Sequence, residues 1–123
     1  MPANELILLL SLEQQIVFKR PRQHCKALKE CIDRNYVSVH FPKTGTEVGF
    51  KLFLPQCDLL SGNFETEEGA VTLSGGLILD FIKVKCTVQL DLATCTGGGY
   101  LTAIEEKEYS MIMGEAEGEL NMV

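Results

Sequence analysis

The sequence predicts an α+β fold in which a largely antiparallel sheet carries two helices on one face. The chain has 123 residues, a length that suits one domain with one hydrophobic core. Apolar residues recur at helical spacing in residues 21–35, whereas they alternate with polar residues in 36–41, 47–54 and 85–93. A strand, a helix and further strands occur in this order twice, so we expect a repeated βαβββ unit.

The first clearly patterned element is a helix. The preceding segment ELILLLSLEQQIVF, residues 5–18, is ambiguous, and a strand followed by a helix is one interpretation of it. Pro21 suits the first turn of the patterned helix, which we expect to end near Asn35. Its apolar stripe is formed by Cys25, Leu28, Cys31 and Ile32.

Two strands follow this helix and form a hairpin. Apolar residues alternate with polar ones in YVSVHF, residues 36–41, and in EVGFKLFL, residues 47–54, with the loop PKTGT between them. Pro55 ends the second strand. Residues 54–69 form a connector with a short apolar turn and an acidic tip, and residues 70–74 form a short strand.

Two periods compete in the segment that begins with the break at Gly75 and Gly76. Residues 77–82 fit a helix, while residues 82–92 alternate as a strand does. One continuous strand through both segments would be about seventeen residues, which is unusually long. We therefore expect a helix over 75–83 and a strand over 85–93.

A glycine-rich turn and a last hairpin complete the predicted domain. The turn is TGGGY, residues 96–100, and the hairpin strands are YLTAI and YSMIM around EEKE. Residues 114–123 are expected to be a flexible tail.

Positive charge is concentrated in one part of this acidic protein. The formal net charge is -6, but residues 1–60 hold eight Lys and Arg against six Asp and Glu, whereas 61–123 hold three against eleven. On the predicted helix, Arg22, Lys26 and Lys29 fall roughly opposite the apolar stripe. Segregation of this kind creates surfaces of opposite sign, which steer binding partners.

The composition favours an intracellular binding protein over an enzyme. The five cysteines are odd in number and include no C-x-x-C pair, which favours reduced thiols in a nuclear or cytoplasmic compartment. The two histidines and the cysteine spacings fit no common metal site, and no catalytic motif is present. The apolar run Leu6 to Leu10 is too short to be a signal peptide or a membrane span. We therefore expect no metal, no cofactor, no small-molecule substrate and no membrane.

Two segments resemble parts of a sliding DNA clamp domain. GAVTLSGGLILDFIKVKC is similar to the clamp segment in which a strand leads into the second inner helix, and YLTAIEEKEYSMIMGEAE resembles the strand pair that ends a clamp domain. The pattern spans about residues 22–117 and is more similar to the checkpoint clamps than to the replicative clamp. The resemblance implies a subunit that binds duplex DNA without catalysis and assembles with other subunits.

The same resemblance implies which residues bind DNA. Inner clamp helices contact phosphates, so the contacts would come from Arg22, Lys26 and Lys29 on the first helix and from Lys83 and Lys85 at the second. Such contacts carry no base information and weaken with salt. Clamp subunits contain two or three such domains, whereas this chain has room for one, so a ring would need several copies or partner subunits.

The last predicted strand offers a protein interface. Residues 109–113 lack proline and a central lysine, and an unpaired strand edge attracts a neighbouring chain. We therefore expect Tyr109, Met111 and Met113 to contact another subunit in a homo- or hetero-oligomer.

Two other functions fit the same composition. The domain can be a protein-interaction module that binds no nucleic acid, with its acidic half facing a basic partner. It can also bind single-stranded nucleic acid on a sheet face that carries Lys51, Phe53, Lys83, Lys85 and Tyr100. A packed Phe53 would remove the stacking surface that this last alternative needs.

Overall fold

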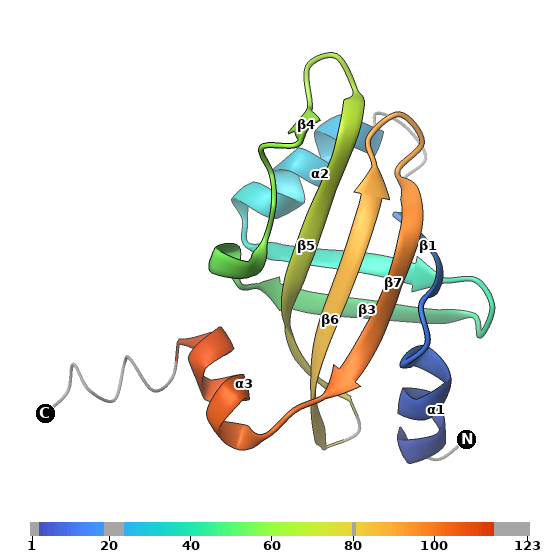
Figure 1. Cartoon of the computed structure of the whole chain (residues 1–123), viewed down its shortest axis with the longest axis vertical. Coiled ribbons are helices and arrows are strands. Elements are labelled where there is room, and N and C mark those ends of the chain that lie inside the picture. Colours follow the sequence, from blue (N-terminus) through green and yellow to red (C-terminus); the bar gives the residue numbers. More distant parts are fainter. Residues whose placement is uncertain (1–2, 19–23, 80, 115–123) are drawn as a thin grey trace, which may run out of the picture.

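Strands dominate the part of the chain that the computed structural model describes, which is residues 3–18, 24–79 and 81–114. Figure 1 shows their arrangement. In chain order the elements are α1 (Ala3–Leu10), β1 (Gln14–Val17), α2 (His24–Asp33), β2 (Tyr36–Phe41), β3 (Thr46–Leu52), the 3-10 helix η1 (Leu54–Gln56), β4 (Gly62–Asn63), β5 (Glu68–Leu79), β6 (Ile82–Asp91), β7 (Thr96–Ala103) and α3 (Glu106–Met113).

Six strands form an antiparallel barrel. They follow the order β3-β2-β1-β7-β6-β5, and β3 pairs back with β5 through Lys51 opposite Gly76 and Leu52 opposite Gly75. The short strand β4 pairs with β5 alone. The predicted α+β class and antiparallel pairing are confirmed, but the prediction of two helices on one sheet face did not include barrel closure.

Barrel closure depends on a close approach of two backbones at Gly75. A Cβ atom built on Gly75 would overlap the carbonyl oxygen of Lys51 on β3. At the next residue, a Cβ atom on Gly76 would contact Ile112 of α3 at 3.0 Å. Gly75 and Gly76 were expected to interrupt the secondary structure. Instead β5 continues through both, because glycine has no Cβ atom and lets β3 and α3 approach closely.

The helix expected over residues 75–83 is absent, and this prediction was wrong. Residues 68–79 and 82–91 instead form the long hairpin of β5 and β6, which pairs from Ala70–Asp91 to Leu79–Ile82. The alternation that begins at Ile82 belongs to β6, and residues 77–79, which fitted a helix, are the end of β5. Among the described residues after 62, no helix lies between two strands, and the predicted βαβββ repeat is not formed.

Two end segments also differ from their predictions. Residues 109–113, expected as an edge strand, belong to helix α3, whose Tyr109 and Ile112 are buried. A helical face with buried residues three apart fits YSMIM better than alternation does. In residues 5–18 the order is reversed, since helix α1 comes first and strand β1 second. The tail predicted over 114–123 lies, except for Gly114, outside the described residues.

Three hairpin loops share one geometry. Residues 42–45, 64–67 and 92–95 are four-residue turns, and the last residue of each has a left-handed backbone: Gly45 (φ 69°), Glu67 (φ 57°) and Cys95 (φ 55°). Four-residue loops are common in hairpins. The predicted loop PKTGT between β2 and β3 is thereby confirmed.

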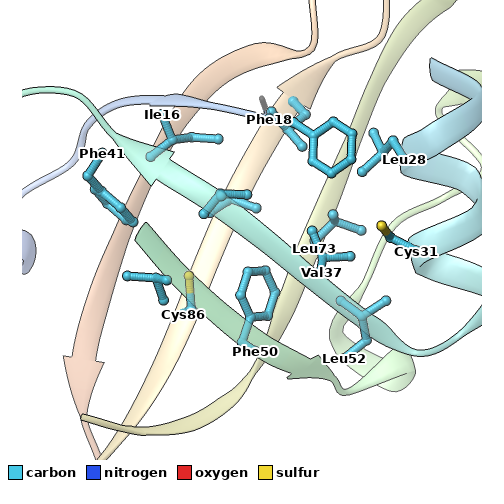
Figure 2. Packing of buried hydrophobic residues seen from close by; sticks show 14 of the residues in the cluster. Ile16, Phe18, Leu28, Cys31, Val37, Phe41, Phe50, Leu52, Leu73 and Cys86 are labelled. Atoms are coloured by element: carbon cyan, nitrogen blue, oxygen red, sulfur yellow. The ribbon is translucent and has the colours of Figure 1, made fainter. Parts of the chain in front are cut away.

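The core fills the barrel and extends under α1 and α2. Figure 2 shows Leu28 and Cys31 of α2 directed toward Phe18, Val37 and Leu73. The apolar stripe predicted for this helix is confirmed at Leu28, Cys31 and Ile32, all of which are buried. The side chain of Cys25 is outside the described part.

The cysteines allow a direct test of the redox state. Cys31, Cys57 and Cys86 are free thiols. Burial raises the pKa of Cys86, and it raises the pKa of Cys57 against a smaller opposing effect of the Ser74 backbone hydrogen bond. Because the thiolate is the reactive form, native protein should react slowly with a thiol reagent, while denatured, non-reduced protein should react at five thiols. A count of three or fewer after denaturation would reveal a disulfide and contradict the predicted intracellular location.

Candidate functional site

An open cleft separates helix α2 from the segment that carries β4. Its volume is about 780 Å³. We call it the α2 cleft. One wall is formed by Lys26 and Lys29 of α2, and the other by Leu60, Ser61, Gly62, Asn63, Phe64, Glu65, Glu68 and Gly69. The cleft therefore brings together residues that lie about thirty to forty positions apart in the sequence.

The lysine wall matches the predicted basic face of the helix. Lys26 and Lys29 are exposed, three residues apart, whereas Leu28 between them is buried. Within residues 3–18, 24–79 and 81–114, neither lysine forms an ion pair; the two ion pairs there are Lys83 with Glu106 and Lys85 with Glu108. Arg22, the third predicted contact on this face, lies outside the described residues.

The facing wall begins with a turn that Asp58 holds in place. The Asp58 carboxylate accepts hydrogen bonds from the Ser61 hydroxyl (2.6 Å) and from the backbone N–H groups of Leu60 (3.1 Å) and Ser61 (3.2 Å). The Ser61 hydroxyl bond and then these backbone bonds lower the pKa of Asp58, outweighing the opposing effect of desolvation. This turn leaves Leu60 99% exposed at the rim of the cleft.

Asn63 organises the next part of the same wall. Its side-chain Oδ1 accepts hydrogen bonds from the backbone N–H groups of Glu65 (2.9 Å) and Thr66 (3.2 Å). The loop that follows places Glu65 and Glu68 in the cleft lining. The α2 cleft thus has a cationic wall and a wall that carries carboxylates.

The second predicted pair of DNA contacts lies elsewhere. Lys83 Nζ is 3.4 Å from a carboxylate oxygen of Glu106 and 5.7 Å from the centre of the Tyr109 ring. Lys85 Nζ is 4.0 Å from a carboxylate oxygen of Glu108. Both lysines therefore face α3, which lies at a different part of the barrel from α2 (Figure 1). The structure does not bring them into the α2 cleft.

The three predicted interface residues, Tyr109, Met111 and Met113, all lie on helix α3. Tyr109 is buried against the barrel, whereas Met111 is 50% exposed. The carbonyl oxygen of Met113 accepts a hydrogen bond from Lys51 Nζ at 3.0 Å, which anchors the end of α3 to β3. Of the three side chains, that of Met111 is the most accessible to a partner.

The residues of the predicted surface for single-stranded nucleic acid also lie at different places on the barrel. Lys51, Lys83 and Lys85 all interact with α3. Tyr100 instead borders a separate small hollow on the outer wall of the barrel, about 170 Å³ in volume. Phe53 is partly buried just after β3, where its backbone N–H donates to Ser74 at 2.7 Å.

Sequence reasoning missed the wall formed by residues 60–69. The segment had two local signals, since Asp58 and Asn63 are residues that favour side-chain-stabilised turns. The exposed Leu60 and the facing position of Glu65 and Glu68 depend on how this segment folds against α2. No local sequence pattern shows that this segment lies opposite α2.

The described part of the chain offers neither a metal centre nor a membrane-spanning helix. Within the described residues, no three His, Cys, Asp or Glu side chains lie together as a metal site would require. No helix there is both long and apolar enough to cross a membrane. No known family model matches the chain, and a search of curated proteins finds no significant similarity. The proposed function therefore rests on the geometry of the α2 cleft.

Proposed function

We propose that the protein is a non-enzymatic binding subunit whose helix α2 contacts the phosphates of duplex DNA. One observation carries this proposal. Lys26 and Lys29 stand side by side on an open cleft with no carboxylate paired to them in the described part of the chain. Lysines that are already paired, as Lys83 and Lys85 are, must give up an interaction before they bind a phosphate.

The contact is expected to be electrostatic and independent of sequence. Lysine ammonium groups that bind phosphates displace condensed counterions, so affinity falls as salt rises. A lysine ammonium is a compact charge on a flexible stem, which suits a phosphate better than the fixed pattern of one base edge. The role that follows is attachment to DNA rather than recognition of a site, in keeping with a clamp-like or scaffold subunit that assembles with other proteins.

A second candidate function is the capture of a protein segment. The observation that favours it is the opposite wall of the cleft, where Glu65 and Glu68 accompany the fully exposed Leu60. These carboxylates would repel DNA that enters deeply, whereas a polypeptide that carries both charges and an apolar residue would fit both walls. In this case the protein binds no nucleic acid.

The test compares two charge-reversed variants. Lys26→Glu with Lys29→Glu should abolish binding of a short random duplex, since attraction becomes repulsion, while circular dichroism stays unchanged. The matched control, Lys43→Glu with Lys107→Glu, makes the same change in net charge at two exposed lysines that lie outside the cleft lining. Fluorescence anisotropy at low salt gives the affinities, with a single-stranded oligonucleotide as a second probe.

Three outcomes are informative. Retained binding in the control and loss in the cleft variant supports the proposal. Equal loss in both variants would mean that overall charge alone governs the binding. Absence of duplex binding by the wild type would overturn the proposal and favour capture of a protein segment.

A further inference from the structure

The turn between β5 and β6 presents an exposed aromatic residue. Phe81 is 94% exposed, and its neighbour on the hairpin, Ile78, is 53% exposed. The turn joins the paired residues Leu79 and Ile82, so Phe81 stands at the tip of the longest hairpin. We call Phe81 and Ile78 the hairpin tip.

The backbone at this residue is also unfavourable. Phe81 has φ 71°, in the left-handed region that bulky residues rarely adopt. Glycine and asparagine adopt this region far more readily than phenylalanine does. Exposure removes the benefit that a phenylalanine gains from burial, so neither the turn nor the core explains this residue. Residues in sparsely populated conformations often serve a function.

The hairpin tip and the α2 cleft lie at opposite ends of the molecule. In Figure 1, α2 and β4 are near the upper end of the barrel, while the paired ends of β5 and β6 next to Phe81 are at the lower end. The tip of one molecule therefore cannot enter its own cleft. It can enter the cleft of another copy.

The two surfaces are chemically complementary. The cleft has a volume of about 780 Å³, and its lining includes Phe64 and the 99% exposed Leu60, which suit an inserted aromatic ring. Beside the tip, Glu106 of α3 is exposed and lies 3.4 Å from Lys83 Nζ, two residues beyond Phe81. Docking against the lysine wall of the cleft would let this carboxylate exchange one exposed ion pair, with Lys83, for another.

We propose that the hairpin tip of one copy docks in the α2 cleft of a second copy. The contact joins two different surfaces, so each molecule keeps one unused tip and one unused cleft, and copies can add head to tail. An aromatic anchor in a pocket is the usual centre of such an interface. This inference goes beyond duplex binding and does not depend on it; a docked tip and a DNA phosphate would compete for the lysine wall of the cleft.

Complementation between two variants tests the proposal. Phe81→Asn removes the ring and suits the left-handed backbone, so the melting temperature should not fall. Leu60→Asp alters the rim of the cleft and leaves the tip intact. In sedimentation velocity at up to about 1 mM, where small transient interfaces associate, each variant alone should be monomeric. Their equimolar mixture should form a dimer and nothing larger, because one working tip and one working cleft remain.

The matched control is Leu8→Ser on α1, which replaces a leucine that is also exposed but lies on neither surface. This variant should associate as the wild type does. The proposal is overturned if the wild type is monomeric, if Phe81→Asn still associates, if the mixture stays monomeric, or if Leu8→Ser abolishes association.

The two proposals fail separately. DNA binding by monomeric Phe81→Asn with no association of the wild type would overturn head-to-tail docking alone. Association with no duplex binding would overturn the proposed function alone. Phe81→Gly serves as a second tip variant should Phe81→Asn fold poorly.

Discussion

Gly75→Ala should destabilise the protein by about 3 kcal/mol or more, which combines the cost of overpacking with the loss of strand pairing. The added Cβ atom would overlap the carbonyl oxygen of Lys51, and the ring of Phe50 is also close. Neither backbone can move without breaking the pairing of β3 with β5, because Leu52 is the register partner of Gly75. The barrel should therefore open along this seam. Urea unfolding followed by circular dichroism measures the change in unfolding free energy.

A matched glycine provides the control. A Cβ atom on Gly98 of β7 would have the Glu13 Oε1 atom as its nearest neighbour, at 3.3 Å. This atom is the far end of a flexible side chain that can move aside, so Gly98→Ala should change the stability by less than about 1 kcal/mol. Equal effects of the two substitutions would show that closure at Gly75 does not stabilise the barrel.

Tyr109→Ala should detach α3 from the barrel at a cost of about 2–4 kcal/mol, as for other large buried side chains. The Tyr109 ring is buried, lies under Lys83 Nζ and is 3.7 Å from the Cβ position of Gly76. Removal of the ring leaves a cavity between α3 and β5. Thermal unfolding measures the loss, and amide exchange within residues 106–113 reports on the helix itself.

The control for this prediction is Met111→Ala on the same helix. Half of the Met111 surface is exposed, so its truncation should change the stability by roughly 0.5 kcal/mol or less. If amide exchange in α3 accelerates equally in both variants, Tyr109 is not what holds the helix.

Local periodicity accounts for the elements that were predicted correctly. The helical stripe of Leu28 and Ile32 and the alternation from Val84 to Leu90 are each complete within one element. Their pattern can be recognised without knowledge of the partner surface. The same holds for the exposed face of Lys26 and Lys29, which lies opposite that stripe.

Competing periods explain the error around Phe81. Leu77 and Phe81 stand four residues apart and fit a helical face, yet the segment is a hairpin. No glycine or asparagine marks its turn. Where the clamp resemblance implies an inner helix, the chain therefore has two paired strands, while the remainder of that resemblance stays a prediction.

Non-local contacts explain what the sequence could not predict. Barrel closure joins Lys51 to Gly76, and the anchor of α3 joins Lys51 to Met113, 62 residues further along the chain. The α2 cleft likewise depends on the position of Leu60 relative to Lys29. The spacing of residues within one segment gives no information about these long-range contacts.

The central claim is that the lysines of α2 bind DNA phosphates, and the salt dependence of wild-type binding to a random duplex tests it most directly. Each phosphate contact contributes a slope of about -0.9 to a plot of log affinity against log salt concentration. Contacts from Lys26 and Lys29 alone predict a slope of about -2, and a contact from Arg22 would make it steeper. The slope should be the same for unrelated duplex sequences. A slope near zero, or no binding at the lowest salt concentration, would contradict the claim.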